Sequence, residues 1–201
     1  MPKVKICGMT EKETIQTAIE HKVDYLGFVF YAKSPRNLTP DQASELTKNV
    51  PSHVKKVAVI VDAKDQFIEQ IKDYFDYFQL HGNEDLKRTK EIKQKFNKKI
   101  IKAIKITDEK SAKTFSTFEE QVDMLLLDSP AMEKTAKFDW QILTKLKITK
   151  PYLVAGSINI NNVDEILKYN PSGIDISAGV ESSPGIKSNE KIIEFLDKVK
   201  S

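Results

Sequence analysis

The sequence predicts a single α/β domain over residues 1–201, in which eight parallel strands close into a (β/α)8 TIM barrel. Short apolar runs rich in β-branched residues alternate with charged stretches of helical period, a pattern typical of a parallel sheet. There are eight such runs in 201 residues, which suits a small barrel of this class. A doubly wound open sheet is the structural alternative.

The expected strands are almost continuously apolar, as strands buried on both faces must be. In chain order they are Val4–Cys7, Tyr25–Phe30, Val57–Val61, Tyr77–Leu80, Ile100–Ile104, Met124–Leu127, Tyr152–Ala155 and Ile174–Ile176. The parallel order requires a crossover segment between each strand and the next.

Amphipathic helices are expected in those crossovers, because apolar residues recur there at helical spacing. The clearest faces are Phe67, Ile68, Ile71, Tyr74 and Phe75; then Trp140, Leu143 and Leu146; then Ile160, Val163, Ile166 and Leu167. Capping residues indicate where helices start. Thr39 precedes Pro40, Asn159 is expected to cap the helix that runs to Leu167, and Ser188 is expected to cap the last helix.

Composition excludes several classes of protein. The net charge is +3, and its positive side is almost wholly lysine spread along the helices, with only two arginines, whereas a nucleic-acid binder would cluster its cations. Scattered lysines of this kind usually form a solvated face. The single cysteine excludes an intramolecular disulfide or a Cys-rich zinc site, and no His-rich metal motif or nucleotide-binding loop is present. No signal peptide or membrane span is recognisable, so we expect a cytoplasmic protein with no metal.

Reactive and small residues fall where this fold would place a functional site, at the carboxyl ends of the strands. The strand ends carry Cys7-Gly8, His81-Gly82, Asp128, Gly156-Ser157 and Ser177-Ala178-Gly179. Cys7 is either a small buried hydrophobe or a thiol whose pKa is lowered by nearby cations. Asp128 is either a structural cap for the next loop or a proton donor. His81 either binds a ligand or packs at its strand end.

Two further features point to an anionic ligand. Small residues after the seventh and eighth strands let backbone N–H groups approach an anion, and this is the usual phosphate site of the barrel. Ser182-Ser183-Pro184 is expected to start the short helix there, although plain tight turns are the alternative. Arg36 follows the second strand, and its guanidinium suits bidentate binding of a carboxylate. A lone surface arginine without a role is the alternative.

The chain resembles the phosphoribosylanthranilate isomerase family over nearly its full length. Seven segments carry the resemblance in order: Val4–Thr10; Gly27–Tyr31 with Lys33–Arg36; Gln79–Glu84; Leu126–Asp128; Phe138–Trp140; Ala155–Asn159; and Asp175–Glu181. Together they are far more specific than any one of them alone.

The resemblance implies an Amadori rearrangement of N-(5-phosphoribosyl)anthranilate in tryptophan biosynthesis, with a small phosphorylated substrate and no cofactor. It implies Asp128 as general acid and Cys7, as thiolate, as general base. Arg36 is implied to contact the anthranilate carboxylate, and His81 and Asp175 to line the substrate site. Backbone groups of Gly156, Ser157, Ala178 and Gly179 are implied to hold the phosphate. We expect a monomer or a homodimer.

The chain departs from the family pattern in two places. The segment Ser129–Lys137 lacks the usual glycines and is expected to be partly disordered until substrate binds. Ser157 replaces a usual glycine and Ala178 a usual serine, but both are small, so phosphate binding is expected to survive. The competing functions are a related phosphosugar isomerase or epimerase, such as the histidine-pathway ProFAR isomerase, and a non-catalytic phosphate-binding barrel. The ProFAR enzyme has a carboxylate where Cys7 stands, and a binding protein needs no acid–base pair.

Overall fold

Eight parallel strands form a closed barrel in the computed structural model, which describes residues 1–129 and 140–200. Each strand pairs with the next along the chain, and β1 also pairs with β8 to close the ring. The strands are β1 (Lys3–Cys7), β2 (Tyr25–Phe30), β3 (Lys55–Ile60), β4 (Tyr77–Leu80), β5 (Lys99–Lys105), β6 (Met124–Asp128), β7 (Tyr152–Ala155) and β8 (Gly173–Ile176). The predicted barrel is confirmed, and the open sheet is excluded.

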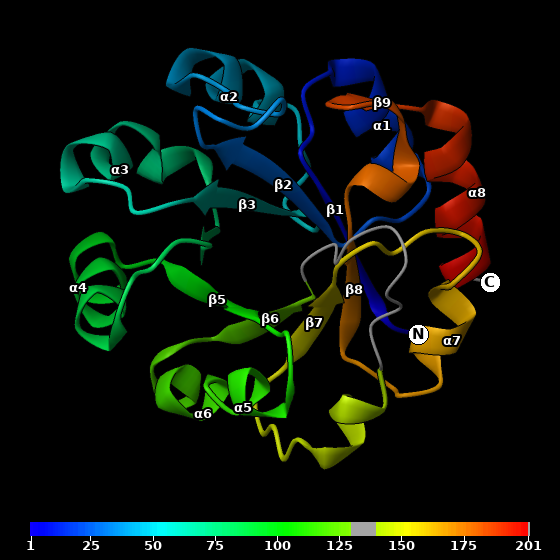
Figure 1. Cartoon of the computed structure of the whole chain (residues 1–201). Coiled ribbons are helices and arrows are strands. Elements are labelled where there is room, and N and C mark those ends of the chain that lie inside the picture. The colour runs from blue at the N-terminus through cyan, green and yellow to red at the C-terminus, as the bar shows by residue number, and fades with distance from the viewer. Residues whose placement is uncertain (130–139, 201) are drawn as a thin grey trace.

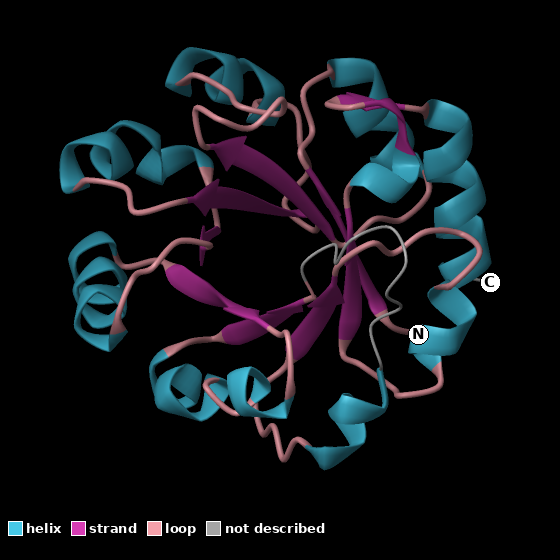
Figure 2. Ribbon diagram, viewed as in Figure 1, coloured by secondary structure: helices cyan, strands magenta, loops and turns pink. Residues whose placement is uncertain are grey.

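Helices surround the ring of strands and cover its outer face (Figure 1, Figure 2). They are α1 (Lys12–Glu20), α2 (Pro40–Thr47), α3 (Asp65–Ile71), α4 (Leu86–Phe96), α5 (Glu109–Ala112), α6 (Phe115–Phe118), α7 (Val163–Leu167) and α8 (Asn189–Lys200). Short 3₁₀ helices lie at Lys72–Tyr74, Glu119–Gln121, Trp140–Lys145 and Ala178–Val180. The two chain ends lie on the same side of the barrel (Figure 1), where the Lys200 ammonium bonds the Pro2 carbonyl.

Apolar side chains form two separate cores. The larger core joins helix residues such as Ile15 and Ile192 to strand residues such as Phe28 and Phe78, so it fills the layer between strands and helices. The smaller core contains strand residues alone, and because side chains alternate along a strand, these point into the barrel. Its buried members are Tyr25, Val57, Tyr77, Ile101, Met124, Leu126, Leu153 and Ala155.

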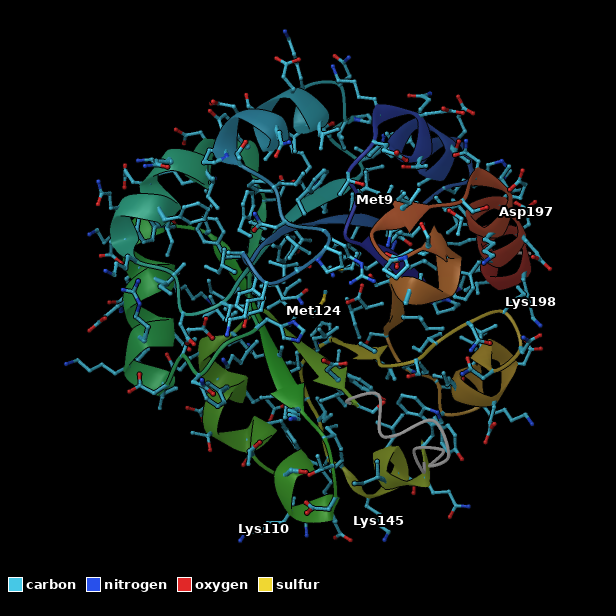
Figure 3. All side chains as sticks on the ribbon, turned by 45° about the horizontal axis from the view of Figure 1, so that its top comes forward. Met9, Lys110, Met124, Lys145, Asp197 and Lys198 are labelled. Carbon is cyan, nitrogen blue, oxygen red and sulfur yellow. The ribbon has the colours of Figure 1, made fainter. Side chains whose placement is uncertain are left out.

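The interior core closes the amino-terminal end of the barrel, so that the opposite end is left for polar groups. Tyr25 and Tyr77, near the starts of β2 and β4, meet edge to face with ring centroids 5.9 Å apart. Met124, at the start of β6, lies inside the ring in Figure 3, while Lys110 and Lys145 project from its rim. The same alternation that buries Tyr25 and Met124 turns Cys7 and Asp128 inward at the carboxyl ends of their strands.

Two of the three predicted helix caps are confirmed. Thr39 forms a full capping box with Gln42 at the start of α2, which has Pro40 as its first residue. The Ser188 hydroxyl accepts from the Lys191 N–H, 3.3 Å away, and so caps α8. The prediction for Asn159 is wrong, because α7 begins only at Val163 and the Asn159 side chain accepts from the nearby Asn161 N–H instead. A short Asx turn, rather than a helix, follows β7.

The segment after β8 also differs from the prediction. The short helix begins at Ala178, and Glu181–Ser183 instead forms β9, which pairs antiparallel with β10 (Ile186–Lys187). The helical face that starts at Trp140 is a 3₁₀ helix. The expectations for Ser129–Lys137 fall, apart from Ser129, on residues 130–139, which lie outside the described part of the chain.

Candidate functional site

A cavity of about 400 Å³ opens at the carboxyl ends of the strands. Residues from β1, β4, β6 and β8 reach it, together with loops after β2, β7 and β8. Every candidate site residue from the sequence lines this one cavity: Cys7, Arg36, His81, Asp128, Gly156, Ser157, Asp175, Ala178 and Gly179. Residues up to 172 positions apart in the chain are therefore brought together by the closure of the barrel.

Cys7 lies at the last position of β1 and is partly exposed to the cavity. Its register partner on β2 is Gly27. A Cβ atom at Gly27 would lie 3.0 Å from Cys7 Sγ and 3.1 Å from Lys5 Nζ. The missing side chain at Gly27 therefore gives both the thiol and the ammonium room inside the barrel.

Lys5 is a functional candidate that the sequence analysis missed. It lies two residues before Cys7 on the same strand and is fully buried inside the barrel. Its Nζ donates to both carboxylate oxygens of its register partner Asp175, at 3.0 Å each. Burial alone would lower the pKa of Lys5, but Asp175 and Cys7 outweigh it and raise that pKa above its ordinary value. Lys5 is therefore charged.

The charged groups around Cys7 shift the pKa of its thiol in opposite directions. Burial raises the pKa of Cys7, and the Asp175 carboxylate adds to that rise. The positive charges of Lys5 and Lys187 oppose it. The net direction is upward, so the expectation of a lowered thiol pKa is wrong: the predicted cations are present, but desolvation outweighs them.

Arg36 lies across the end of β1 and is held by Glu181. A Cβ atom at Gly8, which has φ +80°, would lie 2.2 Å from Arg36 Cδ, so only glycine leaves space for this side chain. Arg36 Nε and Nη2 donate to the two Glu181 oxygens at 2.6 and 2.7 Å. The bidentate contact that the sequence suggested for a substrate carboxylate is thus made with Glu181. Within residues 1–129 and 140–200 no hydrogen bond involves Nη1, which can therefore donate to a ligand.

Glu181 is shared by two cations. Besides Arg36, it accepts from the buried Lys187 ammonium at 2.7 Å, and Lys187 also donates to the Ser177 carbonyl at 3.1 Å. Burial alone would raise the pKa of Glu181, but the hydrogen bonds from Arg36 and Lys187 lower it to about 2. Burial lowers the pKa of Lys187, against the opposing effect of Glu181. The hairpin of β9 and β10 is thereby fixed to the cavity wall.

Glu181 should make the fold sensitive to acid. A carboxylate with a lowered pKa stabilises the fold at pH values above its ordinary pKa of 4.5, and this contribution disappears as the pH falls toward about 2. We expect Glu181→Gln to lower the melting temperature at pH 7, and the difference from wild type to shrink steadily between pH 4.5 and pH 2. Thermal denaturation followed by circular dichroism measures it, and a difference that stays constant across this range would refute the assignment.

Asp128, at the end of β6, is hydrogen-bonded to His81. The hydrogen bond between His81 and Gln79 defines which tautomer His81 adopts. Gln79 Nε2 lies 2.9 Å from His81 Nδ1, and His81 Nε2 lies 3.1 Å from Asp128 Oδ2. With the amide oriented so, Nδ1 accepts and Nε2 carries the proton toward Asp128. The side chain of Asp128 is 27% exposed, at the mouth of the cavity. His81 is therefore a hydrogen-bonding site residue, and Asp128 faces the cavity.

Gln79 is a second residue that the sequence analysis did not single out as a candidate. It is fully buried, lines the cavity, and its Oε1 has no partner among the described residues. A buried amide oxygen without a partner is costly and marks a place where a ligand or water supplies a donor.

The loops after β7 and β8 bring small residues and backbone N–H groups to the cavity. Gly156 has φ +109° and Ser157 has φ +48°. Ser157 therefore occupies the left-handed region, which explains why a glycine suits this position. Ala178 and Gly179 form the first turn of the 3₁₀ helix after β8, where N–H groups lack partners within the helix. This arrangement suits an oxygen-rich anion such as phosphate.

Within residues 1–129 and 140–200, no group of three or more metal-ligating side chains comes together. No helix in the same part of the chain is both long enough and apolar enough to cross a bilayer.

Comparison with known proteins gives one consistent family. A family model described as N-(5'-phosphoribosyl)anthranilate (PRA) isomerase matches residues 4–198. An N-(5'-phosphoribosyl)anthranilate isomerase from Bradyrhizobium diazoefficiens is 36% identical, covering 96% of this chain and 91% of that protein. One from Zymomonas mobilis is also 36% identical, covering 98% of each chain.

Solved structures agree with these sequence matches. The phosphoribosyl anthranilate isomerase of Thermotoga maritima has a TM-score of 0.91 and 30% identity, covering 100% of this chain and 99% of that one. A phosphoribosyl anthranilate isomerase in complex with reduced 1-(o-carboxyphenylamino)-1-deoxyribulose 5-phosphate has a TM-score of 0.89, 30% identity and the same coverage.

Proposed function

The chain belongs to the N-(5'-phosphoribosyl)anthranilate isomerase family, and we propose that Asp128 and Cys7 carry out its isomerisation as general acid and general base. The observation that supports this most strongly is that both side chains line one cavity at the carboxyl end of the barrel. An acid and a base of different chemistry meet the needs of a proton transfer within one sugar.

The reaction runs in two stages. Asp128 donates a proton to the furanose ring oxygen of N-(5-phosphoribosyl)anthranilate, the bond from C1′ to that oxygen breaks, and the nitrogen lone pair forms a Schiff base. The Cys7 thiolate then removes the C2′ proton, and the resulting enolamine tautomerises to 1-(2-carboxyphenylamino)-1-deoxyribulose 5-phosphate. His81 Nε2–H stabilises the Asp128 carboxylate that remains after the first proton has left.

The remaining cavity residues suit the rest of the substrate. The N–H groups of Gly156, Ser157, Ala178 and Gly179 hold the phosphate at the loops after β7 and β8. Arg36 Nη1 binds the anthranilate carboxylate. His81 and Asp175 contact the sugar hydroxyls, since a carboxylate keeps free lone pairs even when both oxygens are bonded to Lys5.

We further propose that residues 1–201 act as one domain, that the protein works as a monomer or a homodimer, and that its substrate is a small phosphorylated molecule that needs no cofactor. A thiol base must remain reduced, which favours the cytoplasm over an oxidising compartment.

Identification of the product tests this function. N-(5-phosphoribosyl)anthranilate labelled with carbon-13 at C2′ is incubated with the purified chain and followed by NMR. We expect the labelled carbon to change from a carbinol to a ketone signal. A label that stays at the carbinol position, or substrate that breaks down only to anthranilate, would argue for a barrel that binds the substrate without isomerising it.

Removing Arg36 should weaken substrate capture. A hydrogen bond to a charged group contributes about 1.5–3 kcal/mol, so we expect Arg36→Met to raise KM by about tenfold or more. The effect on kcat should be smaller than that on KM. Steady-state kinetics measures both.

Arg88→Met serves as the matched control, because Arg88 is the other arginine of the chain and pairs with Asp65, away from the cavity. It should leave KM unchanged. Equal KM values for Arg36→Met and wild type would rule out the carboxylate contact.

A further inference from the structure

The charges around Cys7 do not balance. Lys5, Lys187 and Arg36 supply positive charge near Cys7. Among the described residues their carboxylate partners are Asp175 and Glu181, because Glu181 serves both Lys187 and Arg36. These paired groups therefore comprise three cations and two anions when Cys7 is a neutral thiol.

Two other titratable groups face this space. His81 and Asp128 lie at the ends of β4 and β6, line the cavity, and pair with each other through Nε2 and Oδ2 at 3.1 Å. Within the set of Lys5, Lys187, Arg36, Asp175 and Glu181, ionisation of Cys7 would bring the charge to neutrality.

Lys5 lies beside the thiol. It shares a strand and an inward face with Cys7, and both side chains reach into the space left by Gly27, within 3.0–3.1 Å of the same point. The Lys5 charge opposes the rise in the pKa of Cys7. A fully buried lysine is expensive to desolvate, and an ion pair on a barrel strand can be replaced by apolar residues with little loss of stability. A role in ionising Cys7 gives this lysine a use beyond stability.

We propose that Lys5 is a positioning residue for the isomerase, whose ammonium favours the thiolate form of Cys7 against the cost of burial, with Asp175 as the counter-ion that limits its effect. The inference rests on the proposed function in one respect, that turnover uses the thiolate of Cys7. The ionisation of Cys7 itself is a property of the ligand-free protein and is measured separately.

The test is the pH dependence of Cys7 alkylation by iodoacetamide, followed by the mass increase of the intact chain. Only the thiolate reacts at an appreciable rate. Cys7 is the sole cysteine, so every alkylated thiol is the one of interest. The readout is the pH at which the alkylation rate reaches half of its high-pH plateau. Each variant is scaled to its own plateau, because a change in access to the cavity alters the plateau rate and not this midpoint.

Two substitutions should move that midpoint in opposite directions. Lys5→Met removes the adjacent cation and should raise it by about one pH unit or more, the usual size of such an effect. The rate at pH values below the midpoint then falls by at least about tenfold. Asp175→Asn removes the competing anion and should lower the midpoint. A substitution that only disturbs packing would not produce shifts of opposite sign.

Lys102→Met is the matched control, since Lys102 is also a buried strand lysine that pairs with a carboxylate, but its ammonium bonds Glu84 at 2.9 Å and the Gly82 carbonyl at 3.1 Å rather than groups beside Cys7. Its midpoint should equal that of wild type. An unchanged or lowered midpoint in folded Lys5→Met overturns the proposal. If Lys5→Met does not fold, Asp175→Asn decides, and a midpoint that is not lowered there overturns it as well. Loss of turnover in Lys5→Met with a normal midpoint would also count against it, while leaving Cys7 as the base.

Discussion

Replacing Cys7 with serine is expected to lower kcat by about 10²- to 10⁴-fold, the usual contribution of a positioned general base. A serine hydroxyl is a far weaker base than a thiolate near neutral pH, while the change in shape is small. Lys5 and Lys187 keep their carboxylate partners, so the architecture of the cavity is retained and it should still bind a product analogue.

The measurement is a steady-state rate together with the affinity for a reduced product analogue, determined by calorimetry. A Cys7→Ser protein that keeps more than about a tenth of the wild-type rate would remove Cys7 from the role of base. If binding and turnover were lost together, Cys7 would instead be needed for the architecture of the cavity.

Asp128→Asn is expected to cause a loss of similar size, about 10²- to 10⁴-fold in kcat, in a protein that remains folded. The amide cannot donate a proton to the ring oxygen, yet it can still accept a hydrogen bond from His81. Asp123→Asn is the matched control, because Asp123 precedes the opposite end of the same strand and contacts Lys93 rather than the cavity. It should retain wild-type kcat. An Asp128→Asn protein that is unfolded at room temperature would instead support a structural capping role for Asp128.

The barrel was predictable because its signal is local and repeated. Each strand needs two buried faces, so each produced its own apolar run, and all eight were found. Positions at the ends of these runs then had to converge at one end of the barrel, which is why Cys7, Asp128 and Arg36 meet in one cavity.

Pairings between distant charges were not predictable in the same way. Glu181 and Arg36 lie 145 residues apart, and nothing in the sequence near either shows that they meet. Lysines look alike in sequence whether they are solvated or buried, so nothing near Lys187 indicated that its side chain is buried. For Lys5 a signal did exist: it interrupts an apolar strand two positions before Cys7, and the alternation of side chains places both on one face.

The cap predicted at Asn159 was wrong because its side chain suits two different local structures. An asparagine side chain caps a helix or closes an Asx turn with equal ease. The Asn159 side chain closes an Asx turn, and the helix α7 begins only at Val163.

The central claim is that this cavity isomerises N-(5-phosphoribosyl)anthranilate with Cys7 as the base. The most direct test is the initial rate at which the fluorescence of freshly prepared N-(5-phosphoribosyl)anthranilate is lost, compared between wild type and Cys7→Ser at equal concentration. We expect a loss proportional to the amount of wild-type protein, and a rate close to the spontaneous background with Cys7→Ser. A wild-type rate no faster than background, or equal rates for the two proteins, would contradict the claim.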